Sequence, residues 1–277
     1  MVCHTLNPAM PVLLRPDGTV QVGWDPRRAV VVRPPDGLTA SVLAELLRAM
    51  QDGVSAADLH ALASARGLTD IDALTAALSA AGVLQTTSPG RAHRSASIRI
   101  HGRGPLSDLL SSALRCSGSR VASTRLGHAA VANATVDLVV LSDFLVADPR
   151  MVQDLQAAKV PHLPVRIRDG VGLIGPLVLP GVTSCLNCAD LHRGDRDAAW
   201  PAVATQLQGA VGTADRATVL ATAAVALDQV NRVIDAVRGN KRGDEPPATL
   251  NATLEFDVRT RTTTVRRWSP HPRCSCR

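Results

Sequence analysis

Four cysteines stand in two close pairs that are far apart in the chain. Two residues separate Cys185 from Cys188, one separates Cys274 from Cys276, and eighty-five residues lie between the pairs. A Cys-x-x-Cys turn presents two sulfurs to one centre, and a second pair completes the tetrahedral thiolate set that Zn²⁺ prefers over harder cations. We therefore predict one zinc site. Because sulfur would fill every position, none would remain for water or substrate, so the zinc is expected to be structural and not catalytic.

A redox-active pair and thiols scattered through the core are the alternatives. A thioredoxin-like pair should open a helix after a strand, and it needs no second pair. Closing so long a loop would constrain many residues of the unfolded chain, so metal binding should contribute directly to folding. The remaining Cys3 and Cys116 fit a reducing compartment without disulfides.

The elements that position these cysteines come from a chain of 277 residues with 45% apolar content, which is long for one domain and comfortable for two. The sequence has no Tyr, two Phe and three Trp. Bases would find few aromatic platforms for stacking, so single-stranded nucleic acid is not an expected ligand. The net charge of +6 is carried almost entirely by arginine, with Lys159 and Lys241 the only lysines, and part of it can reflect genomic composition.

The sequence does not predict a membrane segment. Residues 1–10 show no basic flank leading into an apolar core, and no later run reaches eighteen uninterrupted apolar residues. We therefore expect a cytoplasmic protein that does not enter a membrane.

The N-terminal part of the chain has the pattern of short strands followed by helices. The expected strands cover 12–15, 19–23 and 28–33, and the expected helices cover 39–50, 55–66 and 69–81. This order is typical of a small winged-helix-like module, which usually binds DNA. Its third helix carries Asp70 and Asp72 and no basic residue, so it would read a major groove poorly and DNA is not an expected ligand.

A polar stretch at 85–97 predicts a linker, and an α/β pattern follows it. A strand at 97–101, a glycine-rich turn from Gly102 and a helix at 106–114 are typical of the opening of a nucleotide-binding βαβ unit. Further strands are expected at 119–125, 136–141 and 163–167, with a helix at 149–158. The sequence thus predicts an α/β sheet wound by crossovers.

The C-terminal part must bring the two cysteine pairs together. Residues 170–180, rich in Gly and Pro, lead to the first pair, and a long helical region is expected at 203–237. A hairpin with strands at 252–259 and 262–268 then returns the chain to the second pair.

Several stretches carry a resemblance to a known family. Residues 161–170, 175–181 and 185–197, followed by Trp200 and Pro201, resemble the ThiF/MoeB/E1-like superfamily, as does the layout of glycine-rich unit, hairpin and last cysteine pair. The closer resemblance is to its bacteriocin-biosynthesis branch, the Ocin-ThiF-like, leader-peptide-binding proteins of azole/azoline peptide modification. It implies an E1-like domain at 95–277, with a Rossmann-type α/β sheet and a structural zinc.

Residues 11–84 resemble, with a weaker signature, the PqqD-like peptide-recognition module that this branch carries at its N-terminus. The resemblance implies a small winged-helix-like α+β domain at 1–88. Together the two domains imply a non-catalytic scaffold, without catalytic residues, that captures a ribosomal precursor peptide and presents it to a cyclodehydratase-type modifying enzyme. A homodimer through the E1-like domain is also expected from the resemblance.

Enzymes of the superfamily adenylate a C-terminal carboxylate, so an ATP-dependent adenylyltransferase acting on a small protein or peptide is the alternative. Gly102 and Gly104 of the implied nucleotide site are present, and Asp143 stands at the implied magnesium position, although an Asp capping a strand-to-helix turn is as common. The third glycine, the acid and lysine expected at 124–128, and a free cysteine in the crossover are missing. Phosphate charge must be neutralised in such chemistry, so ATP is not an expected cofactor.

The charged segment at 190–197 is expected to be a turn, and its function has two interpretations. Alternating Asp and Arg after a metal-binding turn can form a solvated network that positions the crossover. Alternatively, Arg193 and Arg196 contact a docking partner or a nucleotide. Both interpretations stay open at the level of sequence.

The peptide site is expected at the third N-terminal strand. That strand would lie at a sheet edge with unpaired N–H and C=O groups, where an extended leader segment can pair as an added strand. The third helix would supply an apolar floor, and flanking arginines would attract acidic leader residues. The predicted contacts are Arg28, Val30, Val31, Val32, Arg33, Ile71, Leu74 and Leu78. The apolar positions of the helix can equally be ordinary core.

Overall fold

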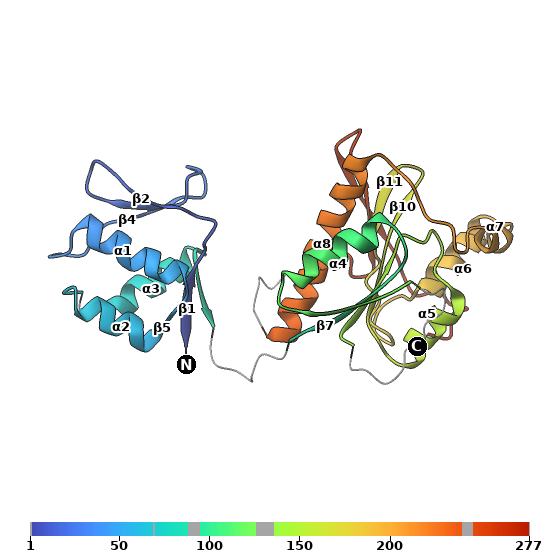
Figure 1. Cartoon of the computed structure of the whole chain (residues 1–277), viewed down its shortest axis with the longest axis horizontal. Helices are drawn as coiled ribbons and strands as arrows, with labels where there is room; N and C mark the ends of the chain where they lie inside the picture. Colours follow the sequence, from blue (N-terminus) through green and yellow to red (C-terminus); the bar gives the residue numbers. More distant parts are fainter. Residues whose placement is uncertain (1, 69, 88–94, 126–135, 240–245, 277) are drawn as a thin grey trace. The chain divides into compact units, whose positions relative to one another are not determined.

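A computed structural model describes residues 2–68, 70–87, 95–125, 136–239 and 246–276. The chain forms two compact units, residues 1–92 (unit 1) and 93–277 (unit 2), and both combine helices with strands (Figure 1). Within the described residues, no helix combines the length and the apolar character needed to cross a bilayer.

Unit 1 contains helices and two small antiparallel sheets. One sheet has the strand order β2-β3-β4, and in the other β1 lies between β5 and β6. The strands are β1 Cys3–Leu6, β2 Val12–Leu14, β3 Val20–Val22, β4 Val30–Val32, β5 Val54–Ser55 and β6 Leu84–Thr87. The helices are α1 Ala40–Gln51, α2 Ala56–Ser64 and α3 Ile71–Ala80.

The local sequence explains where the helices of unit 1 begin. The side chains of Thr39, Ser55 and Asp70 accept backbone N–H groups in the first turns of α1, α2 and α3. Leucines at helical spacing, such as Leu43 and Leu47 of α1, are buried in the core that these helices share with the strands. The helices and the strands β2 to β4 predicted from the sequence are confirmed.

The linker was predicted to start at residue 85, and this start is wrong. Residues 84–87 form β6, which pairs with β1 in the register Leu6↔Leu84. Gln85 and Thr86 are exposed, because β6 lies at the edge of its sheet, and such a polar edge strand has the composition of a linker. Residues 88–94 of the predicted linker lie outside the described residues.

Unit 2 is built on one mixed sheet whose described strands have the order β13-β12-β11-β10-β9-β7-β8. Strands β8, β7, β9 and β10 are parallel, whereas β10 to β13 pair antiparallel. The strands are β7 Ser97–His101, β8 Arg120–Thr124, β9 Leu138–Ser142, β10 His162–Arg168, β11 Val171–Ile174, β12 Ala252–Asp257 and β13 Thr262–Arg267. The strand order reverses at β7, as in a Rossmann-type sheet, so a ligand site is expected at the carboxyl ends of β7 and β9.

Helices cover both faces of this sheet. They are α4 Pro105–Arg115, α5 Pro149–Ala157, α6 Leu186–Arg196, α7 Trp200–Gln206 and α8 Arg216–Arg238. Alternate residues of β9 belong to different cores, because successive side chains of a strand point to opposite faces. Leu138 and Val140 pack with α4 and α8, whereas Val139 and Leu141 pack with α5 and the cysteine pairs.

Two expectations for the C-terminal part are wrong. The charged segment at 190–197 is not a turn but the second half of α6. The helix expected at 203–237 is two helices, because the segment between α7 and α8 returns to the end of β9, where Leu145 N–H donates to Ala210 O at 2.9 Å. The stretch at 170–180, to which the sequence analysis assigns no strand or helix, contains strand β11.

Candidate functional site

The four cysteines predicted as metal ligands lie together in unit 2. The Sγ atom of Cys185 is 3.7 Å from that of Cys188 and 3.6 Å from that of Cys274, and the Sγ atoms of Cys188 and Cys276 are 3.5 Å apart. All four are free thiols. Zn–S bonds of about 2.3 Å in a tetrahedral site place sulfurs about 3.8 Å apart. The cluster could therefore bind a metal ion such as zinc.

The surroundings of the cluster shift the pKa values of its thiols in different directions. Burial raises the pKa of Cys185, and burial together with the hydrogen bond to Cys188 raises the pKa of Cys276 to about 11. Burial acts in the same direction on Cys274, but hydrogen bonds from Asn187 and Cys185 prevail and lower its pKa to about 7. A bound divalent cation would favour four thiolates, so metal uptake is expected to release protons.

The segment that carries the second cysteine pair is held against α6. Nε2 of His271 lies 2.8 Å from Oδ2 of Asp195, and the Arg273 guanidinium pairs with the same carboxylate. Nε2 of His192 lies 3.0 Å from the carbonyl oxygen of Ser269. The hydrogen bond to His271 holds the pKa of Asp195 below its usual value. His192, Asp195 and His271 also have the spacing of metal ligands, but these contacts already account for their arrangement.

Arg193, one of the two docking candidates, belongs to the same bracing network. Its Nη1 is 2.7 Å from Oδ1 of Asp190, and its guanidinium lies over the rings of Trp200 and Trp268, 5.2 and 5.1 Å from their centroids. Arg196 is exposed and has no ion-pair partner among the described residues. Arg193 thus helps to position α6 and is partly screened by the two indoles, whereas Arg196 is accessible. A docking role stays a prediction for both.

Asp143, which stands at the implied magnesium position, bonds to the helix that would bind phosphate. Its Oδ1 accepts the N–H of Leu106 and its Oδ2 accepts the N–H of Ser107, both at 3.0 Å, and the Ser107 hydroxyl donates to the same carboxylate. Asp143 is buried, with a φ of 70° that non-glycine residues rarely adopt. The carboxylate therefore occupies the N-terminus of α4, where a Rossmann-type unit would bind phosphate.

The glycines of the preceding turn are explained by the same contact. A Cβ atom on Gly104 would lie 2.6 Å from Oδ1 of Asp143, and one on Gly102 would lie 2.6 Å from the hydroxyl oxygens of Ser107 and Ser142. A larger residue at 104 would force the carboxylate away from α4, and one at 102 would collide with Ser107 and Ser142, so the close packing itself requires glycine at both positions. Within 124–128, where an acid and a lysine were expected for a nucleotide, only Thr124 and Arg125 belong to the described residues.

The strand predicted to bind peptide is β4, an edge strand of the β2-β3-β4 sheet. Arg28 and Arg33, on either side of it, are exposed. Val30 and Val32 pack against the core of unit 1, whereas Val31 is 51% exposed on the other face. The strand therefore presents one apolar side chain and an arginine at each end to solvent.

The register of the sheet decides which backbone groups of β4 point outward. Hydrogen bonds at both ends of β2 and β3 show that their odd-numbered residues bond to each other. In an antiparallel ladder the alternate residues bond to the opposite neighbour, so Val20 and Val22 bond to Val32 and Val30. Val31, between the two, turns its N–H and C=O to the open edge.

The apolar floor predicted from α3 is buried. Ile71, Leu74 and Leu78 are 2%, 8% and 1% exposed and belong to the core of unit 1, so they offer little surface to a peptide. Sequence reasoning missed three exposed apolar residues of this part of the chain, Leu13 and Leu14 of β2 and Trp24 between β3 and β4, of which Trp24 is 82% exposed. An indole directly after a glycine, in a turn that holds Asp and Pro, is the signal that could have found Trp24.

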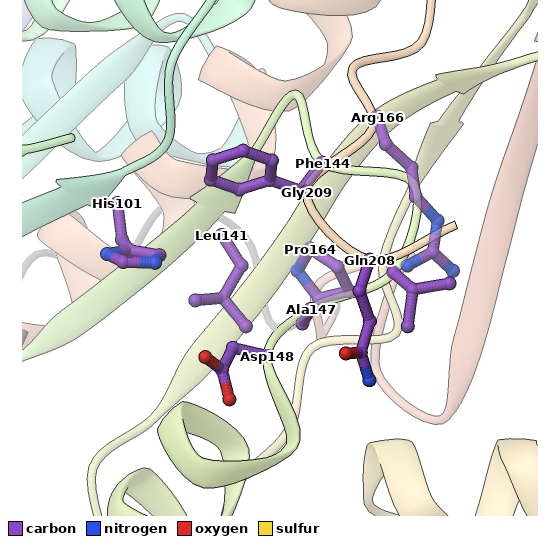
Figure 2. A pocket seen from close by; sticks show the side chains of 10 residues that line it. His101, Leu141, Phe144, Ala147, Asp148, Pro164, Arg166, Gln208 and Gly209 are labelled. Atoms are coloured by element: carbon purple, nitrogen blue, oxygen red, sulfur yellow. The ribbon is translucent and has the colours of Figure 1, made fainter. Parts of the chain in front are cut away.

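A cavity of about 250 Å³, also missed, lies in unit 2 on the same face of the sheet as the cysteine cluster (Figure 2). Its lining residues come from the carboxyl ends of β7 and β9, the middle of β10, the segment before α5 and the segment after α7, so no continuous sequence motif indicates it. They are His101, Leu141, Phe144, Val146, Ala147, Asp148, Pro164, Arg166, Gln208 and Gly209.

Solved structures share the fold of this chain at low sequence identity. The heterocyclase TruD matches with a TM-score of 0.67 and 15% identity, over 100% of this chain and 43% of that chain. A heterocyclase in complex with substrate and cofactor matches with 0.66 and 16%, over 100% and 39%. E. coli MccB with ATP matches with 0.58 and 12%, over 99% of both chains.

Two of these neighbours are heterocyclases and MccB is a microcin C7 biosynthetic enzyme, and the likeness to them is one of fold. The chain spans about two fifths of the length of the two heterocyclases. Comparisons of the sequence with family models and with curated proteins find no match.

Proposed function

We propose that this chain is a non-catalytic E1-like scaffold that captures a precursor peptide and presents it to a cyclodehydratase-type modifying enzyme. The single observation that carries the proposal is the Asp143 carboxylate at the N-terminus of α4. A phosphate could reach these N–H groups only after the carboxylate had left them, and a nearby carboxylate would repel it. The helix end that would stabilise a nucleotide is thus already neutralised by the protein.

The proposal that the partner is a peptide is supported by the molecules that the structural neighbours bind. One is a heterocyclase in complex with its substrate, and E. coli MccB has been solved with the peptide MccA in N-formylated form. In this chain the open edge of β4 offers the N–H and C=O of Val31, which an extended peptide can use as an added strand. Exposed Arg28 and Arg33 would attract acidic residues of the peptide.

The metal proposed for the cysteine cluster is structural zinc. Four sulfurs with tetrahedral spacing leave no open position, which separates such a site from a catalytic one. The ion would join the start of α6 to the end of the chain. The ion would thereby hold α6 in place, and the exposed end of this helix carries Arg196, the accessible docking candidate.

The second candidate function is adenylation of a peptide or small protein. It is favoured by the likeness to MccB, which was solved with ATP and matches over almost the whole of both chains. Adenylation would require Asp143 to release α4 and bind a metal ion instead. The two functions therefore differ in what Asp143 does.

We expect no ATP–pyrophosphate exchange by the isolated protein, with or without a candidate precursor peptide. Asp143→Asn should leave that result unchanged and lower the free energy of unfolding by about 1–3 kcal/mol, because hydrogen bonds of a buried carboxylate are lost. Radiolabelled pyrophosphate and urea denaturation measure the two effects. Robust exchange in the wild type that disappears in Asp143→Ala would establish adenylation instead.

We also propose that the chain forms a homodimer through unit 2. Light scattering coupled to size exclusion should then give a mass near twice the 29.0 kDa of one chain. A monomer mass that persists as the protein concentration is raised would contradict this.

A further inference from the structure

The cavity at the end of β9 and beside β10 contains the guanidinium of Arg166, which has no counter-ion among the described residues. Pro164 and Arg166 point to the cavity face of β10, while Val165 and Ile167 between and beyond them point into the opposite core. Figure 2 shows the Arg166 side chain extending along the cavity wall. Among the residues that the structure describes, none forms a hydrogen bond or ion pair with its guanidinium.

The nearest charges leave this guanidinium in a positive environment. Arg193 and Arg168 are its cationic neighbours, and Asp190 is the anionic one. Asp190 is already bonded to Arg193 and to the indole N–H of Trp200. Burial, followed by the Arg193 charge, lowers the pKa of Arg166 to about 10, so it is still charged at neutral pH. Arg166 is half-buried, and a partly desolvated cation without a partner among the described residues is costly, so an anion from solvent would relieve that cost.

The remaining lining decides which anion fits. Leu141, Phe144 and Val146 give the cavity apolar walls, which match a short hydrocarbon chain. Asp148 also lines it, and its carboxylate caps α5 by accepting the N–H of Arg150 at 2.8 Å. A second negative charge disfavours a dianion such as phosphate, whereas one carboxylate matches the planar fork of a single guanidinium. A volume of 250 Å³ holds about eight non-hydrogen atoms at roughly 30 Å³ each.

We propose that this cavity is a binding site for a small organic monocarboxylate, with the carboxylate on Arg166 and a short apolar chain against Leu141 and Phe144. The site lies wholly within unit 2 and goes beyond the proposed capture of a peptide by unit 1. It lies next to the strand-order reversal at β7, where α/β sheets bind ligands at the carboxyl ends of their strands.

Titration of hexanoate into the full-length protein, followed by calorimetry or ligand-observed NMR, tests the site. Saturable binding is expected, with affinity that falls for butyrate, for inorganic phosphate and for the neutral hexanamide. Arg166→Gln should weaken hexanoate binding by at least about tenfold, because a charge-assisted bidentate contact is lost. Arg166→Lys, which keeps the charge and loses the fork, should fall between the two.

Arg232→Gln is the matched control, since Arg232 is a partly exposed arginine of α8 that pairs with Asp228 outside the cavity lining and is not among the charges that act on Arg166. It should bind hexanoate as the wild type does. Bound metal and melting temperature, measured for each variant, show that the fold is kept. The proposal is overturned if hexanoate does not saturate the wild type, if hexanamide binds equally well, or if a folded Arg166→Gln or Arg166→Lys variant keeps full affinity. Peptide binding to unit 1 is measured separately and does not enter this test.

Discussion

Cys276→Ser is expected to release the bound zinc and to destabilise unit 2 more than any other single change considered. Three thiolates would remain, and a metal that joins segments eighty-five residues apart contributes its binding free energy to folding. Structural zinc binds peptides with about 10–16 kcal/mol, so the loss of one ligand should cost at least about 3 kcal/mol. For a unit of this size that corresponds to a fall in Tm of roughly 10 °C.

Elemental analysis and thermal melting of freshly purified protein measure the two effects. Cys116→Ser is the matched control, because Cys116 is an exposed thiol outside the cluster, and it should keep one zinc per chain and an unchanged Tm. A wild-type protein without zinc, or a Cys276→Ser variant that melts like the wild type, would contradict a structural metal site.

Val31→Pro is expected to weaken binding of a precursor peptide by about 5- to 150-fold while unit 1 stays folded. Proline removes the N–H of Val31, which points to the open edge and not toward β3, so the ladder within the sheet is kept. An added peptide strand would lose that hydrogen bond and meet the pyrrolidine ring, at a cost of about 1–3 kcal/mol. The exposed indole of Trp24 or a labelled peptide can report the binding.

Leu14→Pro is the matched control for this edge. Leu14 lies on β2, at the opposite edge of the same sheet, and the ladder turns its N–H outward as well. The neighbouring outward carbonyl, that of Val12, accepts a hydrogen bond from Arg48 at 3.1 Å, which confirms the direction. Equal loss of affinity in both variants would indicate a general disturbance of unit 1, and equal affinity of wild type and Val31→Pro would place the peptide elsewhere.

The cysteine cluster was predictable because its signal is local and chemical. Two pairs of one residue type, each with ligand spacing, need only a fold that brings them together. The helices of unit 1 were predictable for a similar reason, since Thr39, Ser55 and Asp70 mark their starts within the sequence. In both cases the determining groups lie within a few residues of each other.

The elements that the sequence analysis missed or predicted wrongly depend on contacts between distant segments. Gly172 lies in β11, where it pairs with Ile167 of β10 and Phe256 of β12. Glycine is required there because a Cβ atom would lie 3.0 Å from the Cβ of Thr222 of α8. The charged segment at 190–197 is helical because its side chains bond to Trp200 and to the last residues of the chain. Composition favours a loop in both places, and tertiary packing overrides it.

The role of Asp143 at the candidate site could not be predicted from the sequence either, because it depends on contacts with distant residues. The sequence places an acid after β9 but cannot tell a metal ligand from a cap, because both follow a strand. The difference lies in hydrogen bonds to residues 36 and 37 positions away. The arginine of the cavity was missed for a related reason, since its neighbours come from four separate segments.

Calorimetric titration of a candidate precursor peptide into the zinc-loaded protein, with and without MgATP, tests the central claim most directly. The scaffold account predicts saturable binding of the peptide with the same Kd in both conditions and no heat from nucleotide turnover. Absence of peptide binding without nucleotide, or binding accompanied by conversion of ATP to AMP and pyrophosphate, would contradict it.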